Sequence, residues 1–285
     1  MFFNFKEGVM MKTNKASFSG ANSKLLKSLM LAALAAPCMA MAADAPASPH
    51  TFTSNVGLVS DYLYRGISQT NAKPAIQGGF DYAHSNGLYA GIWGSSISWL
   101  TDSPAVTGAT SSQVELDTYL GLKNSFAENF SYDIGLLRYN YSASYIATLP
   151  AGSAKADTNE IYGSLGYKWI SAKYSRSLGD TFGIASAVGT NYFEVNASVP
   201  VPDTGITLGA HAGRQAYKGS VADGLVLLNS SPTYRDYKIS VTKDLSGFVV
   251  GLAYSNTNAN RTQYTNSLNR YLGKNTAVLS VTRSF

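Results

Sequence analysis

A period-two alternation of apolar and polar side chains recurs along the chain after residue 50, in segments about ten residues long. In residues 113–123, valine and leucine occupy most even positions, whereas Glu115, Asp117 and Lys123 occupy odd ones. In residues 236–242, odd positions are apolar and even positions are polar. Because successive side chains of a strand point to opposite faces, the pattern predicts strands with one apolar and one polar face.

Applied to the whole chain, this pattern predicts an all-β protein of about 12 strands. The predicted strands span residues 52–64, 74–83, 88–99, 113–123, 130–142, 159–168, 171–178, 189–199, 206–216, 233–243, 248–256 and 275–285. The turn near Trp169 is the weakest boundary. The facing of 88–99 stays open, because Tyr89 and Trp93 on one phase compete with Leu88 and Ile92 on the other.

The connections between these strands alternate in length. Beginning with the first, every second one is long: 65–73, 100–112, 143–158, 179–188, 217–232 and 257–274. The others are short, and His84-Ser85-Asn86-Gly87 contains the Asn-Gly pair that favours tight hairpins. Long loops at one end and short turns at the other are typical of outer-membrane barrels, and a soluble sandwich has no reason to keep this order. We therefore expect a single antiparallel transmembrane β-barrel.

The first 42 residues have the features of a secretory signal peptide. Lys24 and Lys27 precede a short apolar run, and Ala40-Met41-Ala42 provides small residues for cleavage. The run is too short for a membrane helix, which needs about 20 residues. We expect a signal peptide over 1–42, a periplasmic lead over 43–51 and the barrel over 52–285.

The mature part of the chain is nearly neutral and has no thiol. Cys38 is the only cysteine and lies in the signal, where a lipoprotein signal is the alternative interpretation. Residues 1–42 hold five lysines and one glutamate of the 22 basic and 17 acidic residues, which leaves a net charge of +1. This balance gives no electrostatic reason to bind nucleic acid.

Aromatic side chains gather near both ends of the predicted strands. Near the short connections they are Phe52, Tyr82, Phe130, Tyr132, Tyr167, Phe248 and Phe285, and near the long ones Tyr62, Tyr64, Phe193, Tyr237 and Tyr254. Two aromatic girdles around an apolar band are typical of a barrel that crosses a membrane. The alternative is that tyrosine simply favours strands.

The segment Tyr64-Arg65-Gly66-Ile67-Ser68-Gln69-Thr70, preceded by Ser60-Asp61-Tyr62, resembles the opening signature of the TorF-type porin-like family, the Gcw_chp outer-membrane proteins. Tyr89-Ala90-Gly91-Ile92-Trp93-Gly94-Ser95 and Leu208-Gly209-Ala210-His211 are similar to later parts of that family. The resemblance covers nearly the whole mature chain. It implies an outer-membrane location and a porin-like barrel, but it implies no particular substrate.

Within this segment, Gly66 permits a turn that other residues disfavour. Arg65 follows the end of the first predicted strand and continues the inward phase of Asp61, because the two positions differ by an even number of residues. One interpretation is that Arg65 pairs with acids of the inner wall and holds the loop in place. The other is that it places a charge at the mouth of a channel.

The polar phase of the strands is expected to face the lumen. Its candidate pore-lining residues are Asp61, Arg65, Gln77, Asp81, Glu115, Asp117, Asp133, Glu160, Glu194, His211, Asp236 and Lys238. Eight strands give a filled interior and 16–18 a wide channel, so about 12 predict a narrow passage. The acidic excess of this set favours cations or neutral solutes over anions.

Four arginines lie instead on the apolar phase, near the long connections: Arg138, Arg176, Arg214 and Arg235. Guanidinium groups suit phosphate recognition, so we expect a ring that contacts lipopolysaccharide in the outer leaflet. Snorkelling or pairing with the loops is the alternative.

No catalytic, cofactor-binding or metal-binding pattern stands out. The histidines are His50, His84 and His211, and no serine is marked as a nucleophile for the last of these. We therefore expect a protein that is not an enzyme and has no cofactor and no metal centre.

The expected function is a narrow outer-membrane channel for passive diffusion of small hydrophilic solutes. Its alternative is a structural or adhesive barrel that acts through its loops without conductance. The closing strand ends on Phe285 and is similar to the strand that such barrels present to the barrel-assembly machinery. The solute and the oligomeric state stay open.

Overall fold

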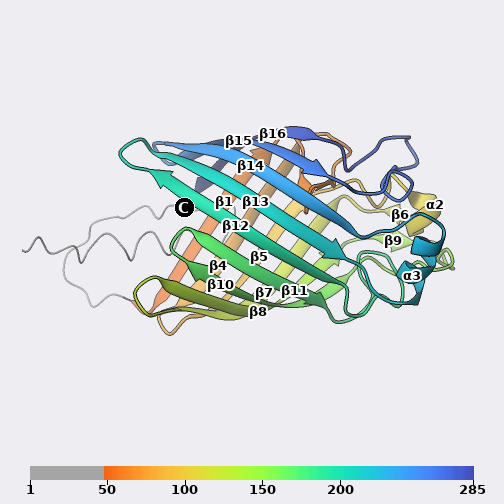
Figure 1. Ribbon diagram of the computed structural model, residues 1–285, viewed down its shortest axis with the longest axis horizontal. Coiled ribbons are helices and arrows are strands. Elements are labelled where there is room, and N and C mark those ends of the chain that lie inside the picture. The colour runs from red at the N-terminus through yellow and green to blue at the C-terminus, as the bar shows by residue number, and fades with distance from the viewer. Residues whose placement is uncertain (1–47) are drawn as a thin grey trace, which may run out of the picture.

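The computed structural model describes residues 48–285, which form one closed antiparallel barrel of 12 strands (Figure 1). The expected signal peptide lies outside the described residues. The barrel strands are β1 His50–Val59, β4 Ala75–His84, β5 Leu88–Ser96, β7 Val114–Phe126, β8 Phe130–Tyr141, β10 Thr158–Tyr167, β11 Ile170–Ser177, β12 Asn191–Val201, β13 Ile206–Ala216, β14 Tyr234–Leu245, β15 Phe248–Thr257 and β16 Thr276–Ser284. Within residues 48–285, no helix has the length and apolar character needed to cross a bilayer.

Closure comes from the pairing of the first strand with the last. β1 pairs with β4 on one side and with β16 on the other, in a register that sets Leu58 opposite Val281. Every other strand pairs with its neighbours in sequence. A barrel closed in this way has no free edge, so its wall satisfies its own backbone hydrogen bonds.

The alternation of the sequence becomes an apolar exterior and a polar interior. Leu120 and Ile239 are 57% and 64% exposed, whereas Asp117 and Asp236 on the opposite face are buried. This is the reverse of a soluble protein, and it is the arrangement that a lipid surrounding requires. In β5, Leu88 and Ile92 are exposed, which settles the facing that the sequence left open.

The connections follow the predicted alternation. β10 and β11 are joined by Lys168 and Trp169 alone, so the weakest boundary of the sequence analysis is confirmed. All short turns lie at the end of the barrel opposite to α2, Pro104–Thr107, and α3, Ser220–Leu227, which belong to the long loops (Figure 1).

The first predicted strand is too long at its C-terminal end and starts too late. β1 begins at His50 and ends at Val59, and the chain then leaves the wall. Tyr62 and Tyr64 are therefore not part of an outer aromatic girdle, because the ring of Tyr62 is buried and that of Tyr64 packs on Tyr139 inside the barrel.

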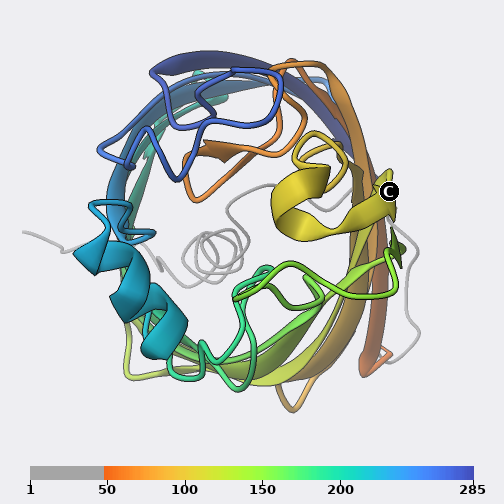
Figure 2. The ribbon, with the colours of Figure 1, turned by 90° about the vertical axis from the view of Figure 1, so that its right-hand side faces the viewer.

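The connection from residue 60 to 74 folds into the barrel as a hairpin of β2, Leu63–Tyr64, and β3, Ile67–Ser68 (Figure 2). Its two turn residues are Arg65 and Gly66, with φ of 47° and 79°. A positive φ at both central residues is what a type I′ hairpin turn requires. We call residues 60–74 the lumen hairpin.

The tip of the lumen hairpin contacts four strands of the wall. A Cβ on Gly66 would lie 2.6 Å from Thr257 Cγ2 and 2.9 Å from Asp236 Cβ. These residues belong to β15 and β14. Arg65 also contacts Glu160 of β10 and Gln215 of β13. The hairpin therefore crosses the lumen.

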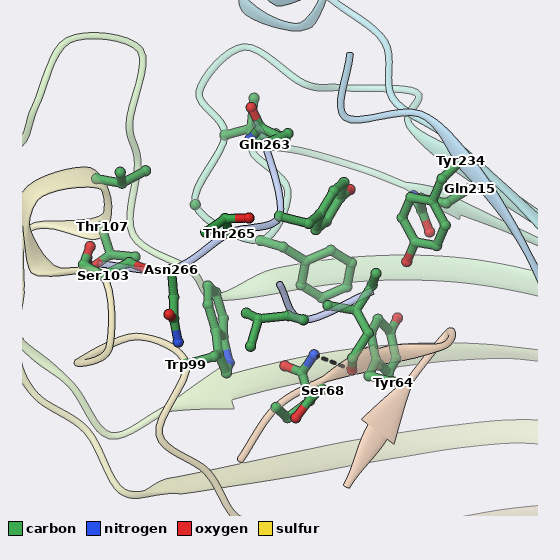
Figure 3. A pocket seen from close by; sticks show the side chains of 18 of the residues that line it. Tyr64, Ser68, Trp99, Ser103, Thr107, Gln215, Tyr234, Gln263, Thr265 and Asn266 are labelled. Atoms are coloured by element: carbon green, nitrogen blue, oxygen red, sulfur yellow. Dashed lines mark hydrogen bonds between the residues drawn. The ribbon is translucent and has the colours of Figure 1, made fainter. Parts of the chain in front are cut away.

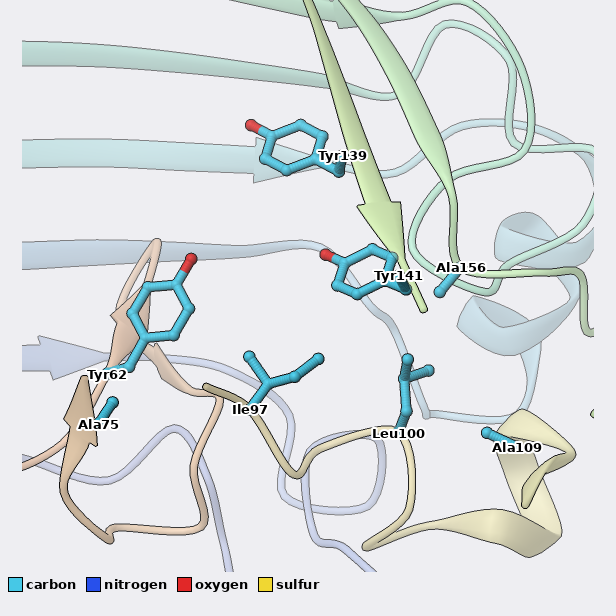
Figure 4. Packing of buried hydrophobic residues seen from close by; sticks show 8 residues of the cluster. All are labelled: Tyr62, Ala75, Ile97, Leu100, Ala109, Tyr139, Tyr141 and Ala156. Atoms are coloured by element: carbon cyan, nitrogen blue, oxygen red, sulfur yellow. The ribbon is translucent and has the colours of Figure 1, made fainter. Parts of the chain in front are cut away.

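The apolar core of the barrel lies inside its long-loop end, around the base of the hairpin (Figure 4). Tyr62, Tyr139 and Tyr141 pack there with Ile97 and Leu100. Above the core, β6, Ala109–Ser111, pairs with β9, Ser144–Tyr145, so that two long loops support each other. The long-loop end of the barrel is thus packed by its own loops.

We expect Gly66→Val to lower the free energy of unfolding by about 1–3 kcal/mol, because it combines a strained φ with a clash against Thr257 and Asp236. Urea unfolding of the refolded barrel measures this. Gly163→Val is the matched control, since no atom lies within 4 Å of its Cβ and no strained φ is involved. Equal stability of the two variants would contradict the close packing of the hairpin tip against β14 and β15.

Candidate functional site

The half of the lumen towards the short turns contains a cavity of about 720 Å³. It extends from Thr51 and Ser284, near the ends of the barrel strands, to Asp61 and Tyr62 of the lumen hairpin. Its charged lining residues are Asp61, Asp81, Asp117, Asp133, Lys123, Lys173 and Lys238. Groups of both signs in a space of this size keep it hydrated.

Tyrosines hold the charges of this cavity in place. Tyr89 donates its hydroxyl proton to Asp133 over 2.6 Å and also contacts the hydroxyl of Tyr162. The ammonium of Lys173 lies 4.0 Å from the ring centre of Tyr162, and that of Lys123 lies 4.8 Å from Tyr89. The phenol groups thus lie between the carboxylate of Asp133 and the ammonium groups of Lys123 and Lys173.

A second polar group forms around His211 on β13. Its Nε2 lies 2.8 Å from Asp236 Oδ1 and 2.9 Å from the hydroxyl of Tyr192. Its Nδ1 lies 2.7 Å from Asn196, which donates to Glu194 over 2.9 Å. Within residues 48–285, no serine hydroxyl is hydrogen-bonded to this ring, so the geometry offers no serine nucleophile to it.

Between the two halves of the lumen lies a constriction built on Arg65. The guanidinium donates to Glu160 over 2.8 Å and to Gln215 Oε1 over 2.6 Å. It also lies over the rings of Tyr64 and Tyr192, at 4.8 and 4.3 Å from their centres. The side chains of Arg65 and Glu160 are 7% and 1% exposed, so the ion pair is buried.

The base of the hairpin is anchored by Asp61. Its Oδ1 accepts hydrogen bonds from Ser68 over 2.6 Å and Thr70 over 3.0 Å. Burial raises the pKa of the Asp61 carboxyl, and these two hydrogen bonds oppose that rise. Asp61 therefore ties β3, and the residues that follow it, to the end of β1.

A separate cavity of about 250 Å³ lies on the long-loop side of the constriction (Figure 3). Tyr64 and Gln215 form its floor, and residues 262–266 contribute to its wall. The two cavities share no lining residue among those described. The lumen is therefore divided by the hairpin.

The structure places the sequence candidates in three settings. Asp61, Asp117, Asp133 and Lys238 line the large cavity. Arg65 forms the constriction. Glu115 is buried beside the apolar core, where it accepts a hydrogen bond from Tyr62 over 2.7 Å. Glu194, His211 and Asp236 form the group around the histidine.

Sequence reasoning missed Lys173 and the tyrosines that support the charges. Lys173 lies on the phase of β11 opposite to Arg176, together with Ser171 and Ser175, and this alternation in the sequence could have identified its facing. With three lysines beside four acids in the lining, the acidic excess is smaller than the sequence candidates indicated.

The four arginines of the apolar phase are exposed on the outer surface, each near the long-loop end of its strand. Arg214 and Arg235 are direct neighbours across β13 and β14. Arg138 is paired with Asp157 at 3.3 Å. Within the described chain, no group of three His, Cys, Asp or Glu side chains has the arrangement of a metal site.

Comparison with known protein families identifies the family of this chain. Residues 43–285 match the model of a family described as "Bacterial protein of unknown function (Gcw_chp)". No curated protein sequence matches the chain.

Several solved barrels are similar in structure. The NanC porin is 9% identical with a TM-score of 0.46, over 82% of this chain and 99% of that chain. The outer membrane channel DcaP of Acinetobacter baumannii is 10% identical with a TM-score of 0.40, over 83% and 97%. The outer membrane protein OprD from Pseudomonas aeruginosa is 11% identical with a TM-score of 0.35, over 82% of this chain and 64% of that chain. At identities and scores this low, the likeness carries no argument about the function of this chain.

We expect Arg65→Met and Glu160→Gln each to lower the free energy of unfolding by about 3–5 kcal/mol, because each leaves one buried charge without its partner. The double variant should lose less free energy of unfolding than the two single variants lose together. Arg138→Met with Asp157→Asn breaks an exposed pair and should cost about 0–1 kcal/mol. Urea unfolding measures all four, and strictly additive losses at Arg65 and Glu160 would contradict a coupled pair.

Proposed function

We propose that this chain, which belongs to the Gcw_chp family of bacterial proteins, lies in the outer membrane of a Gram-negative bacterium and conducts small hydrophilic solutes passively. The observation that carries the proposal is the cavity of about 720 Å³, lined by charged side chains, inside a closed barrel with an apolar exterior. A barrel that served only as a structural element would have no need of this charged space.

The outer surface supports the membrane location. Exposed leucine, isoleucine, valine and phenylalanine side chains cover the strands, with Phe52, Phe130 and Phe248 near the short turns and Phe193 and Tyr254 near the long loops. In lipid such side chains are favourable, and a wall without a free edge leaves no backbone group unpaired. In water the same surface would aggregate.

The interior supports passive conduction of small solutes. Acids and lysines of the large cavity hold water without forming one deep binding site, and a passage conducts only if solutes leave as readily as they enter. The lumen hairpin limits the size of the solute, because the side chains of Arg65, Tyr64 and Gln215 separate the two cavities. The near balance of charge in the lining favours weak ion selectivity.

The second candidate function is a structural or adhesive barrel without conductance. The observation that favours it is the buried ion pair of Arg65 and Glu160, which holds the hairpin across the lumen. In either case we propose two further partners for the chain. One is the barrel-assembly machinery, which would bind the final strand through Phe285, and the other is lipopolysaccharide.

Single-channel recording in planar bilayers tests the proposal. We expect small, discrete conductance steps for the refolded barrel. A variant with Gly-Gly in place of residues 63–68 lacks the hairpin and should conduct several-fold more, because the constriction is gone. Heat-modifiable migration on gels shows that each barrel has folded. A folded and inserted native barrel that stays silent would overturn the channel, whatever the variant does, and leave the structural role.

We expect the quadruple change of Arg138, Arg176, Arg214 and Arg235 to Gln to weaken lipopolysaccharide binding, because exposed guanidinium groups at this level lie where lipid phosphates are found. Binding to lipopolysaccharide-containing vesicles measures the effect. Lys274→Gln, an exposed loop cation, is the control and should bind normally. Unchanged binding of the quadruple variant would leave snorkelling or pairing with the loops as the role of these residues.

A further inference from the structure

The large cavity is lined by charges of both signs that do not satisfy one another. Its three lysines, Lys123, Lys173 and Lys238, are half-buried and face the cavity. Within residues 48–285, none of their ammonium groups forms an ion pair or a hydrogen bond. Each keeps surface open to the cavity, because none is a buried atom without a partner. The donors of all three ammonium groups are therefore free for a solute.

Two aspartates of the same cavity each keep one carboxylate oxygen free. Asp81 accepts a hydrogen bond from Tyr119 through Oδ1, and Asp133 accepts one from Tyr89 through Oδ1. In the described chain, Oδ2 of either residue accepts no hydrogen bond and still has surface open to the cavity. The cavity therefore offers open carboxylate oxygens together with open ammonium groups.

The ring of Tyr89 keeps two neighbouring charges apart. Lys123 and Asp133 are direct cross-strand neighbours on β7 and β8, yet they form no ion pair with each other. The ammonium of Lys123 lies 4.8 Å from the ring centre of Tyr89, where a cation is attracted to the aromatic face. The hydroxyl of the same ring donates to Asp133 over 2.6 Å. One phenol thus holds a cation and an anion separately, and both still face the cavity.

The charge balance of the lining decides which kind of charged solute suits it. A simple anion is attracted by the three lysines but repelled by the four aspartates, and a simple cation has the opposite difficulty. A zwitterion has no net charge, so a nearly balanced wall does not repel it. Its ammonium can donate to an open carboxylate while its carboxylate accepts from an open ammonium. Such charge-assisted hydrogen bonds are stronger than the uncharged ones that a neutral solute would make.

We propose that the large cavity admits small zwitterions, such as short amino acids, in preference to neutral solutes of the same size. The ammonium of the solute donates to Oδ2 of Asp81 or Asp133, and its carboxylate accepts from one of the three lysines. A cavity of about 720 Å³ has room for such a molecule together with water. Each contact replaces a contact with water, so binding stays weak enough for release. This assignment rests on the proposed channel and names the class of solute that it carries.

Swelling of liposomes that contain the refolded full chain tests the assignment. Glycine and glycolamide are isomers, but only glycine carries separated charges, so the pair isolates the effect of the zwitterion. We expect swelling in isosmotic glycine to be several-fold faster than in glycolamide, after subtraction of the rate for liposomes without protein. An uncharged pore would favour glycolamide, because charged groups lose more hydration on entry.

The outcomes separate this assignment from the channel itself. Swelling that is equal in the two solutes, or faster in glycolamide, would overturn the preference for zwitterions and leave the channel in place. No swelling in either solute, with folded barrel demonstrably inserted, would overturn the channel and the assignment with it.

Two sets of variants remove one partner of the zwitterion each. The first set removes the open ammonium groups: Lys123→Met, Lys173→Met and Lys238→Met together. The second removes the open carboxylates: Asp81→Asn and Asp133→Asn together. Because a zwitterion uses both signs at once, each set should lower the rate for glycine to that for glycolamide, and the rate for glycolamide itself should stay as in the native barrel.

Lys243→Met is the matched control. It makes the same change on β14 as Lys238→Met does, but at an exposed position on the outer face, so it should keep the native ratio of the two rates. Heat-modifiable migration shows that each barrel has folded, and Lys238→Met alone should shift the ratio in the same direction by a smaller amount if the triple variant does not fold. A preference for glycine that survives the loss of either sign in a folded barrel would overturn the assignment.

Discussion

The need to pair every backbone group without help from water is the constraint on which this structure depends. Lipid offers no hydrogen bonds, so a wall of strands must close on itself, and here β1 closes it by pairing with both β4 and β16. Closure with alternating side chains then sends apolar groups outward and polar groups inward. The hydrated lumen is thus a consequence of the same rule that builds the wall.

One buried ion pair decides how the polar lumen is divided. The pair of Arg65 and Glu160 compensates two charges that would otherwise be costly, and it holds the lumen hairpin against the far wall. The hairpin separates a charged cavity from an uncharged, aromatic one. The lumen therefore has a neutral, aromatic side towards the long loops and a charged side towards the short turns.

Much of the barrel could be predicted from the sequence because its signals are local. Period-two alternation identified all the wall strands, and the alternation of long and short connections set their order in the sheet. The two-residue turn at Lys168 and Trp169 and the inward phase of Asp117 and Asp133 follow from the same local rule. These features depend only on neighbours in the chain or on the next strand.

The division of the lumen could not be predicted in this way. Asp61 and Arg65 continue the inward phase of β1, so alternation alone extended that strand to residue 64, whereas the chain leaves the wall after Val59. What draws it inward is a set of partners from β10, β13 and β14 that lie across the barrel and far away in sequence. The sequence by itself determined the wall, its closure and the polarity of its two faces, because each strand needs only its neighbours. Only the tertiary structure decided where the lumen is blocked and which side chains face each cavity, because those contacts exist only once the barrel has closed.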